Sequence, residues 1–229
     1  MAKHGKKYND VQKKKPTSLV SLEEAVSFVK ANASAKFDES VEIAMRLGVD
    51  IKKSDQTVRG TVNLSHGTGK HVRVIVFAAG VLADDAKAAG AEEVGYEDLI
   101  EKVKNGWTDF DVAIATTDAM KEVRKIARIL GPRGLMPNPK TGTVTDDTAA
   151  AVIAAKGGKV DFRMDRTGNV CVLCGKRSFD ADKLVGNIHT IIEAVRAERP
   201  AGAKGTFIRT LTVCSTMGVG VHVLVKEVE

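Results

Sequence analysis

Residues 66–78 read HGTGKHVRVIVFA, and the hydrophobic pattern of the chain changes within this stretch. Before it, apolar residues alternate with polar ones, whereas Val72 to Ala78 is almost continuously apolar. A short apolar run rich in β-branched residues is typical of a strand that is buried on both faces of a parallel sheet. The Gly-Thr-Gly sequence in front of the run therefore indicates a boundary at which a wound α/β segment begins.

The segment after this strand alternates between helical and strand patterns. Apolar spacing predicts a second buried strand at 112–115 and helices near 82–89, 96–104, 118–130 and 149–155. This alternation indicates a wound α/β sheet. The segment closes with Lys156-Gly-Gly-Lys159, a second link that contains glycine.

Both ends of the chain instead show patterns of half-buried strands and amphipathic helices. Ser21 and Glu24 have the spacing of a capping box, which predicts that a helix begins there. The expected helices are 21–33 and 180–199. The expected strands are 41–47, 57–64, 207–213 and 219–228. A hairpin is expected from two further strands, 160–164 and 170–173.

The two glycine links bracket the wound segment, so the simplest interpretation is an insertion. We expect a two-domain protein of mixed α/β and α+β class. Residues 1–67 and 159–229 would form a split α+β domain, and residues 68–158 would form an inserted α/β domain. Two chain crossings through glycine would make a hinge.

The net charge of +6 is unevenly distributed over the 229 residues. Residues 1–15 hold six Lys and one Asp, and residues 119–140 hold six basic residues and one acidic residue. A basic arm and a basic patch favour phosphate, because neutralised phosphates release counterions. The alternative is a solvated tail and an ordinary charged surface. The absence of a long apolar run and of a signal-like start, together with three Cys, predicts a soluble protein in a reducing compartment.

No catalytic or metal-binding motif stands out in the sequence. The run Gly67-Thr-Gly-Lys70 lacks the first glycine of a phosphate loop, and His71 stands where that loop needs Ser or Thr. Cys171 and Cys174 have the spacing of a zinc knuckle, but the chain offers no matching second pair, so buried apolar thiols are the better interpretation. We expect neither cofactor nor metal.

Two loops have unusual compositions. Residues 129–140 contain three of the five Pro and follow a basic helix, which indicates either a rigid surface connection or a shaped platform for an RNA backbone. Residues 214–220 place small hydroxyls beside glycine, which suits either a simple turn or the close approach of a nucleic-acid backbone.

Five runs resemble the bacterial ribosomal protein one family of the large subunit. They are PRGLMPNPKTGTV (132–144), STMG (215–218), AKFDESVE (35–42), FRMDRTGN (162–169) and PAGAKGT (200–206). The resemblance extends over all 229 residues in order, and PRGLMPNP and STMG are highly specific. It implies a ferredoxin-like split domain that contacts ribosomal RNA and an inserted Rossmann-like domain with three layers.

The resemblance also implies a structural protein of the large ribosomal subunit that is not an enzyme. Such a protein binds 23S rRNA at the mobile stalk beside the exit site and assists release of deacylated tRNA. It also represses translation of its own operon by binding the messenger leader. Its partners would be that rRNA, exit-site tRNA and that messenger, with no membrane. It would be cytoplasmic, and monomeric when off the ribosome.

Matching positions imply an rRNA surface in which Phe37 and Met217 supply apolar contact and the other members supply hydroxyls, an amide or charge. The set is Lys36, Phe37, Ser40, Arg163, Asp165, Ser215, Thr216, Met217 and Gly218. The basic patch proposed for the tRNA side is Lys121, Arg124, Lys125, Arg128, Arg133 and Lys140. Val219 replaces the Pro of many relatives, which predicts a looser turn.

Two other classes of function remain open at this point. The wound domain could be an enzyme with a small-molecule site at its strand ends, although no phosphate loop or polar triad is evident. A nucleic-acid chaperone that acts off the ribosome would instead depend mainly on the basic arm.

Overall fold

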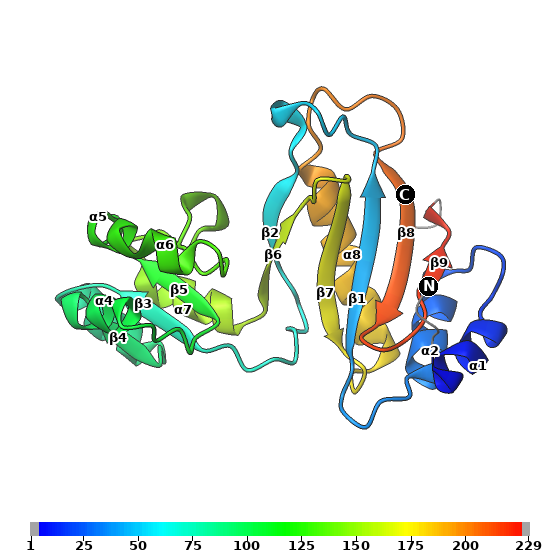
Figure 1. Cartoon of the computed structure of the whole chain (residues 1–229), viewed down its shortest axis with the longest axis horizontal. Helices are drawn as coiled ribbons and strands as arrows, with labels where there is room; N and C mark the ends of the chain where they lie inside the picture. Colours follow the sequence, from blue (N-terminus) through cyan, green and yellow to red (C-terminus); the bar gives the residue numbers. More distant parts are fainter. Residues whose placement is uncertain (1–4, 226–229) are drawn as a thin grey trace. The chain divides into compact units, whose positions relative to one another are not determined.

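The computed structural model describes residues 5–225. A four-stranded antiparallel sheet draws its strands from both ends of the chain (Figure 1). Its order is β7-β1-β8-β9, with bounds β7 Asn169–Lys176, β1 Ser40–Leu47, β8 Ile208–Ser215 and β9 Val221–Val223. The central strand β1 therefore pairs on both sides with strands from much later in the sequence.

Helices α2 (Leu22–Asn32) and α8 (Ala181–Ala197) cover one face of this sheet. The strand pattern explains why, since Val41, Ile43 and Met45 are fully buried against these helices while the residues between them reach the other face. Each buried side chain of this size contributes roughly 1.5–3 kcal/mol of transfer free energy. The opposite face carries Glu42, Ala44 and Arg46 of β1, and none of the core clusters of the described residues includes them.

The ends of the chain differ in detail from the sequence prediction. The Ser21 hydroxyl accepts a hydrogen bond from the Glu24 amide at 3.2 Å, as the capping box predicts. The basic arm forms a helix that was not predicted, α1 (Lys6–Lys14), in which no residue is buried. The predicted strand 219–228 is shorter, since β9 ends at Val223, and residues 226–229 lie outside the described residues.

The predicted hairpin is wrong. Strand β6 (Lys159–Arg163) pairs with β2 (Arg59–Asn63) in a separate two-stranded sheet, while β7 pairs with β1. Packing between β2 and β6 accounts for the choice, because Gly60 leaves room for the buried Phe162 ring, which would come within 2.7 Å of an added Cβ. The sequence pattern identified the strands but not their partners.

The middle of the chain forms a parallel sheet of order β4-β3-β5 (Figure 1). Its strands are β4 Glu93–Gly95, β3 Val74–Phe77 and β5 Val112–Ala115. All four residues of the central strand β3 are buried, as the apolar run predicts. The short edge strand β4 was not predicted.

Helices cover both faces of the parallel sheet and make three layers. Val74 and Val76 pack in one cluster with α3 (Val81–Ala88) and α7 (Thr148–Lys156). Ile75 and Phe77 pack in another with residues of α4, α5 and α6. The helix expected at 118–130 is divided into α5 (Met120–Val123), the 3-10 turn η2 (Arg124–Ile126) and α6 (Ala127–Leu130). The remaining elements are α4 Glu97–Lys104, η1 Ser54–Gln56 and η3 Pro139–Thr141.

The chain divides into two compact units, which are described separately. Unit 1 comprises the chain up to Gly69 and from Val160 onward, and unit 2 is Lys70–Lys159. That each unit folds by itself, as a domain would, stays a prediction. Among the helices formed by residues 5–225, none has the length and apolar character needed to cross a bilayer.

Candidate nucleic-acid interface

The turn from Ser215 to Gly218 joins β8 to β9 and lies against the start of β1 in unit 1. Ser215 pairs with Val41 at the end of β8. One residue further, the Thr216 amide donates to the Ser40 carbonyl oxygen at 3.0 Å, and the Thr216 hydroxyl accepts from the Ser40 amide, also at 3.0 Å. Two predicted site residues that are far apart in sequence, Ser40 and Thr216, are thus joined by one backbone hydrogen bond and one bond to the Thr216 hydroxyl.

The turn itself leaves no room for a side chain at Gly218. An added Cβ there would lie 2.4 Å from the Ser215 hydroxyl oxygen. The Gly218 amide donates to the Ser215 carbonyl oxygen at 3.1 Å, which closes the turn. Val219, the position at which a looser turn was expected, is buried behind it.

A buried carboxylate lies beneath this turn. Glu39 has no exposed surface, and its Oε2 atom accepts hydrogen bonds from the Ser215 hydroxyl at 2.6 Å and the Met217 amide at 3.3 Å. Its Oε1 atom accepts from the Ala35 amide at 2.9 Å. Burial by itself raises the pKa of Glu39, but these hydrogen bonds and the nearby Arg177 charge outweigh it and lower the pKa below its usual value.

Two large apolar side chains are exposed beside Glu39. Phe37 is 55% exposed and Met217 is 61% exposed, although most side chains of this kind are buried in the protein. Phe37 lies two residues after Ala35, whose amide donates to the Glu39 carboxylate, and Met217 donates its own amide to the same carboxylate. An exposed ring and a polarizable thioether are suitable surfaces for unstacked bases.

Basic groups border the same end of the sheet. Lys36 is exposed, and the Lys176 ammonium donates to the Ser40 hydroxyl at 2.8 Å. The Arg177 amide donates to the Glu39 carbonyl oxygen at 2.8 Å, which places this residue next to the turn. Sequence reasoning missed Glu39, Lys176 and Arg177. The basic pair that follows the predicted strand 170–173 after two intervening residues was the available signal.

The structure places Arg163 and Asp165 in a different region from this turn. Both are exposed near the far end of β1, where Arg46 pairs with Asn169, and six residues of strand between Ser40 and Arg46 span about 20 Å. The predicted rRNA residues therefore form two groups and not one continuous set.

Asp165 is also engaged within its own turn. Its Oδ1 atom accepts from the backbone amides of Asn169 and Thr167, each at 2.8 Å. The hydrogen bond from the Asn169 amide is the largest cause that lowers the pKa of Asp165 to about 2. The geometry accounts for Asp165 as the residue that shapes the β6–β7 connection.

The basic patch of unit 2 is exposed at all six positions, namely Lys121, Arg124, Lys125, Arg128, Arg133 and Lys140. Ion pairs join Lys121 to Asp118 at 3.9 Å and Lys125 to Glu122 at 2.6 Å, and Arg133 donates to the Thr108 hydroxyl. No ion pair engages Arg124, Arg128 or Lys140 among residues 5–225.

The proline-rich loop beside this patch is held by its own polar groups. The Asn138 amide donates to the Thr143 hydroxyl at 2.8 Å, and the Asn138 side chain accepts from the Lys140 amide at 2.9 Å. The Asn138 carbonyl oxygen accepts from the amide and hydroxyl of Thr141. The loop is therefore held in shape by hydrogen bonds among its own residues.

Comparison with known proteins decides between the open classes of function. Residues 29–219 match the family described as ribosomal protein L1p/L10e. The chain belongs to this family.

Relatives in the L1 family match over nearly the full chain. Large ribosomal subunit protein uL1 of Mycobacteroides abscessus is 52% identical over 224 residues, which cover 97% of this chain and 95% of the relative. Large ribosomal subunit protein uL1 of Fervidobacterium nodosum is 52% identical over 223 residues, covering 96% and 95%. Membership makes the chain a structural protein of the large ribosomal subunit and not an enzyme.

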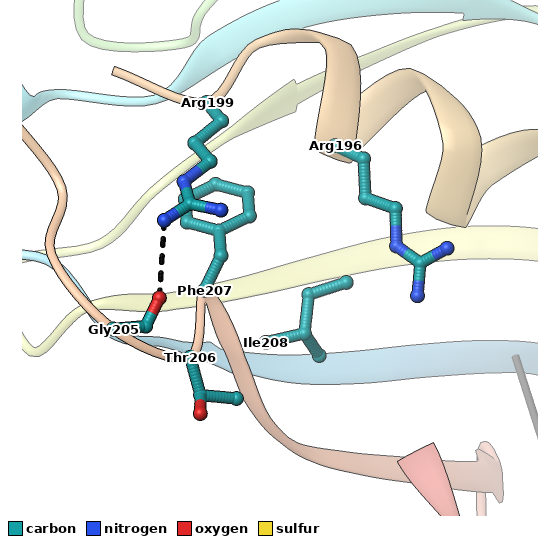
Figure 2. A pocket seen from close by; sticks show the side chains of 6 residues that line it. All are labelled: Arg196, Arg199, Gly205, Thr206, Phe207 and Ile208. Atoms are coloured by element: carbon teal, nitrogen blue, oxygen red, sulfur yellow. Dashed lines mark hydrogen bonds between the residues drawn. The ribbon is translucent and has the colours of Figure 1, made fainter. Parts of the chain in front are cut away.

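A pocket of about 550 Å³ lies near the end of α8 and is lined by Arg196, Arg199 and residues 205–208. The Arg199 guanidinium donates to the carbonyl oxygens of Ala203 at 3.1 Å and Gly205 at 3.0 Å. Figure 2 shows it lying over the Phe207 ring, with Arg196 apart from it. The Arg199 Cζ atom is 5.7 Å from the centre of that ring. Arg199 thus holds the loop that follows α8.

The three thiols of this L1-family chain do not form a metal site among the described residues. Cys174 is buried, Cys214 is half-buried and Cys171 is exposed. Burial is the largest cause that raises the pKa of all three thiols, and that of Cys214 rises to about 12. Neutral thiols are poor zinc ligands.

Proposed function

We propose that unit 1 binds 23S rRNA through the surface formed by Phe37, Ser40 and the turn from Ser215 to Gly218. The observation that carries this proposal is that two large apolar side chains, Phe37 and Met217, are exposed on two segments that are joined by hydrogen bonds. Sequence-specific RNA recognition commonly stacks unstacked bases on such side chains and reads their edges with hydroxyl and backbone groups.

Each part of the surface has a distinct role in the proposal. Phe37 and Met217 stack against bases. The Ser40 and Thr216 hydroxyls retain bonding capacity beyond their internal hydrogen bonds, which suits a ribose 2′-hydroxyl. Lys36 faces the phosphate backbone and adds a salt-dependent contribution. Arg163, at the other end of β1, belongs to a second and separate contact, and Asp165 shapes the turn beside it.

The finer functions are also part of the proposal, and membership of the family supports them. The rRNA site is the mobile stalk beside the exit site, and the same surface binds the leader of its own operon messenger and represses translation. We assign residues 1–67 with 159–229 to the RNA-binding domain and 68–158 to an inserted domain that acts as a lever. The basic patch of unit 2 contacts deacylated tRNA and assists its release.

Two aspartate substitutions test the rRNA surface. Met217→Asp places a charge on the proposed surface, whereas Ile153→Asp changes a similarly exposed side chain, 62% exposed, on α7 of unit 2. Binding of a short stalk RNA, measured across a salt series, is expected to weaken about tenfold or more for Met217→Asp and to change little for Ile153→Asp. A wild-type affinity in Met217→Asp would move the main contact to the Arg163 end of β1.

The tRNA contact has its own test. Arg124→Glu with Arg128→Glu reverses two charges of the patch that have no ion pair in the described chain. We expect a loss of affinity for deacylated tRNA and an unchanged affinity for the stalk RNA. Equal losses for both RNAs would mean that the patch supplies only a general attraction to phosphate.

A further inference from the structure

The Glu39 carboxylate joins two parts of the proposed RNA surface that are distant in sequence. Its three hydrogen-bond donors are the Ala35 amide before β1, and the Ser215 hydroxyl and Met217 amide after β8. The two latter bonds bridge 176 and 178 residues. The Glu39 carbonyl oxygen accepts from Arg177 as well, so a third segment meets at the same point.

A carboxylate is an unusual choice for this position. Glu39 is fully buried, and removing a charge from water is costly unless hydrogen bonds replace the lost hydration. Here all three donors point at the two carboxylate oxygens, and none of the buried side-chain nitrogen or oxygen atoms in the described chain lacks a partner. An apolar side chain of similar size would fill the space but would leave the Ser215 hydroxyl and two amides unpaired.

The carboxylate is ionised at neutral pH, because the hydrogen bonds and Arg177 lower its pKa. The charged form accepts at both oxygens and donates from neither. It therefore favours one arrangement of the turn, in which the Met217 amide and the Ser215 hydroxyl both face inward. With these groups turned inward, the Met217 side chain is left on the surface.

We propose that Glu39 is a positioning residue, which holds the turn from Ser215 to Gly218 and the segment around Phe37 in their RNA-binding arrangement before RNA arrives. Glu39 has no exposed surface and so acts through the residues that it holds. This inference rests on the proposed rRNA surface and adds how that surface is preorganised. Preorganisation raises affinity because the ordering cost is met in the free protein.

The central variant is Glu39→Gln, which keeps the shape but turns one acceptor into a donor that faces the inward amides or hydroxyl. The matched control is Glu42→Gln, which makes the same change of charge at an exposed carboxylate three residues further along, within β1. We expect affinity for the stalk RNA to fall about tenfold or more in Glu39→Gln and to stay near wild type in Glu42→Gln. The salt slope should be unchanged in both, because the phosphate-facing cations remain.

A signal from the free protein separates positioning from general stability. In protein labelled at methionine methyl groups, the Met217 resonance is expected to shift or broaden in Glu39→Gln, whereas that of Met45, buried in the core on β1, stays in place. Saturating RNA should bring the Met217 resonance of the variant to the position that it has in the RNA-bound wild-type protein. An unchanged Met217 resonance together with wild-type affinity would overturn the inference.

Two further variants keep the result interpretable. If Glu39→Gln does not fold, Ser215→Ala is used instead, because it removes one hydrogen bond from the same carboxylate. The Met217 resonance of the free Ser215→Ala protein should then shift. The absence of a shift would overturn the inference. Met217→Asp tests the surface itself. A loss of affinity in Met217→Asp with none in Glu39→Gln would leave the proposed function standing and reject the role of Glu39, whereas no loss in Met217→Asp would reject the surface.

Discussion

Asn187 and Gly67 are joined by a hydrogen bond in which the Asn187 side-chain amide donates to the Gly67 carbonyl oxygen at 3.0 Å. Asn187 is fully buried in the middle of α8, and its side chain also accepts from the His66 amide at 3.2 Å and donates to the Cys174 carbonyl oxygen at 2.8 Å. The first glycine link is therefore hydrogen-bonded to helix α8 of unit 1.

Replacing Asn187 should destabilise unit 1. In Asn187→Ala, the His66 amide and the carbonyl oxygens of Gly67 and Cys174 lose a buried partner, so we expect the free energy of unfolding to fall by about 2–4 kcal/mol. Urea unfolding measures this change. Thr190→Ala, one turn further along the same helix, removes a bond to the Gly186 carbonyl oxygen at a half-buried position and should cost less than about 1 kcal/mol. Equal effects would contradict the role of Asn187.

Limited proteolysis tests whether the two units are domains. Apart from the Lys-rich arm, trypsin should cleave after Lys70 and Lys156, which are exposed at the two links. The fragments before and after the inserted segment should then elute together under native conditions, because β1 lies between β7 and β8. They should separate only in denaturant. Separation of the fragments in native buffer would be incompatible with a split domain.

Much of this organisation was predictable from local patterns. The buried strand at 74–77, the glycine links and the capping box all depend on residues close in sequence, so the pattern contains the information. The partner of β6 did not follow, because it depends on Phe162 packing over Gly60, a contact about 100 residues apart. The short strand β4 has too few residues for a periodic pattern.

The candidate site was predictable only in part, for a related reason. The resemblance to the family located Phe37 and the turn from Ser215 to Gly218, which the structure brings together. It also included Arg163 and Asp165, which the structure places at the other end of β1, because matching positions in a family do not reveal at which end of the sheet a residue lies. Glu39 was passed over, since a single Glu in a polar run looks exposed until the fold places it beneath the turn.

The Asp111 carboxylate should make the stability of unit 2 depend on acidic pH. Its hydrogen bond with Lys70, at 2.6 Å, is the largest cause that lowers the pKa of Asp111 to about 2, and two bonds from Arg73 add to it. The folded pKa lies below the ordinary value of 3.8, so the unfolded chain binds the proton more readily. This contribution is fully present above about pH 4 and is lost as the pH falls toward 2.

Asp111→Asn measures that contribution directly. The variant should be less stable than wild type at pH 7, and the difference should shrink as the pH is lowered from about 4 to 2. Unfolding by urea at several pH values gives the comparison. Asp118→Asn removes a carboxylate whose side chain is 98% exposed, 3.9 Å from Lys121, and should have little effect at any pH. A constant difference for Asp111→Asn across this range would reject the assignment.

Deleting residues 2–15 should weaken RNA binding without abolishing it. Six Lys lie in residues 1–15, and no residue of α1 is buried, so the melting temperature should hardly change. The slope of log K against log salt should decrease by about 0.7–0.9 for each phosphate contact that is lost. A complete loss of affinity would instead favour a protein that binds nucleic acid mainly through its arm.

The position of β1 between β7 and β8 also determines when this protein becomes functional during its own synthesis. The nascent chain releases β1 and Phe37 early, but the strands that flank β1 and the turn that carries Met217 emerge only near the end of translation. The inserted unit is continuous in sequence, and as an independent domain it would be able to close its sheet before β7 and β8 are synthesised. A prematurely terminated chain that lacks β8 would also lack the turn that carries Met217, so under the proposed function it would not compete with the finished protein for RNA.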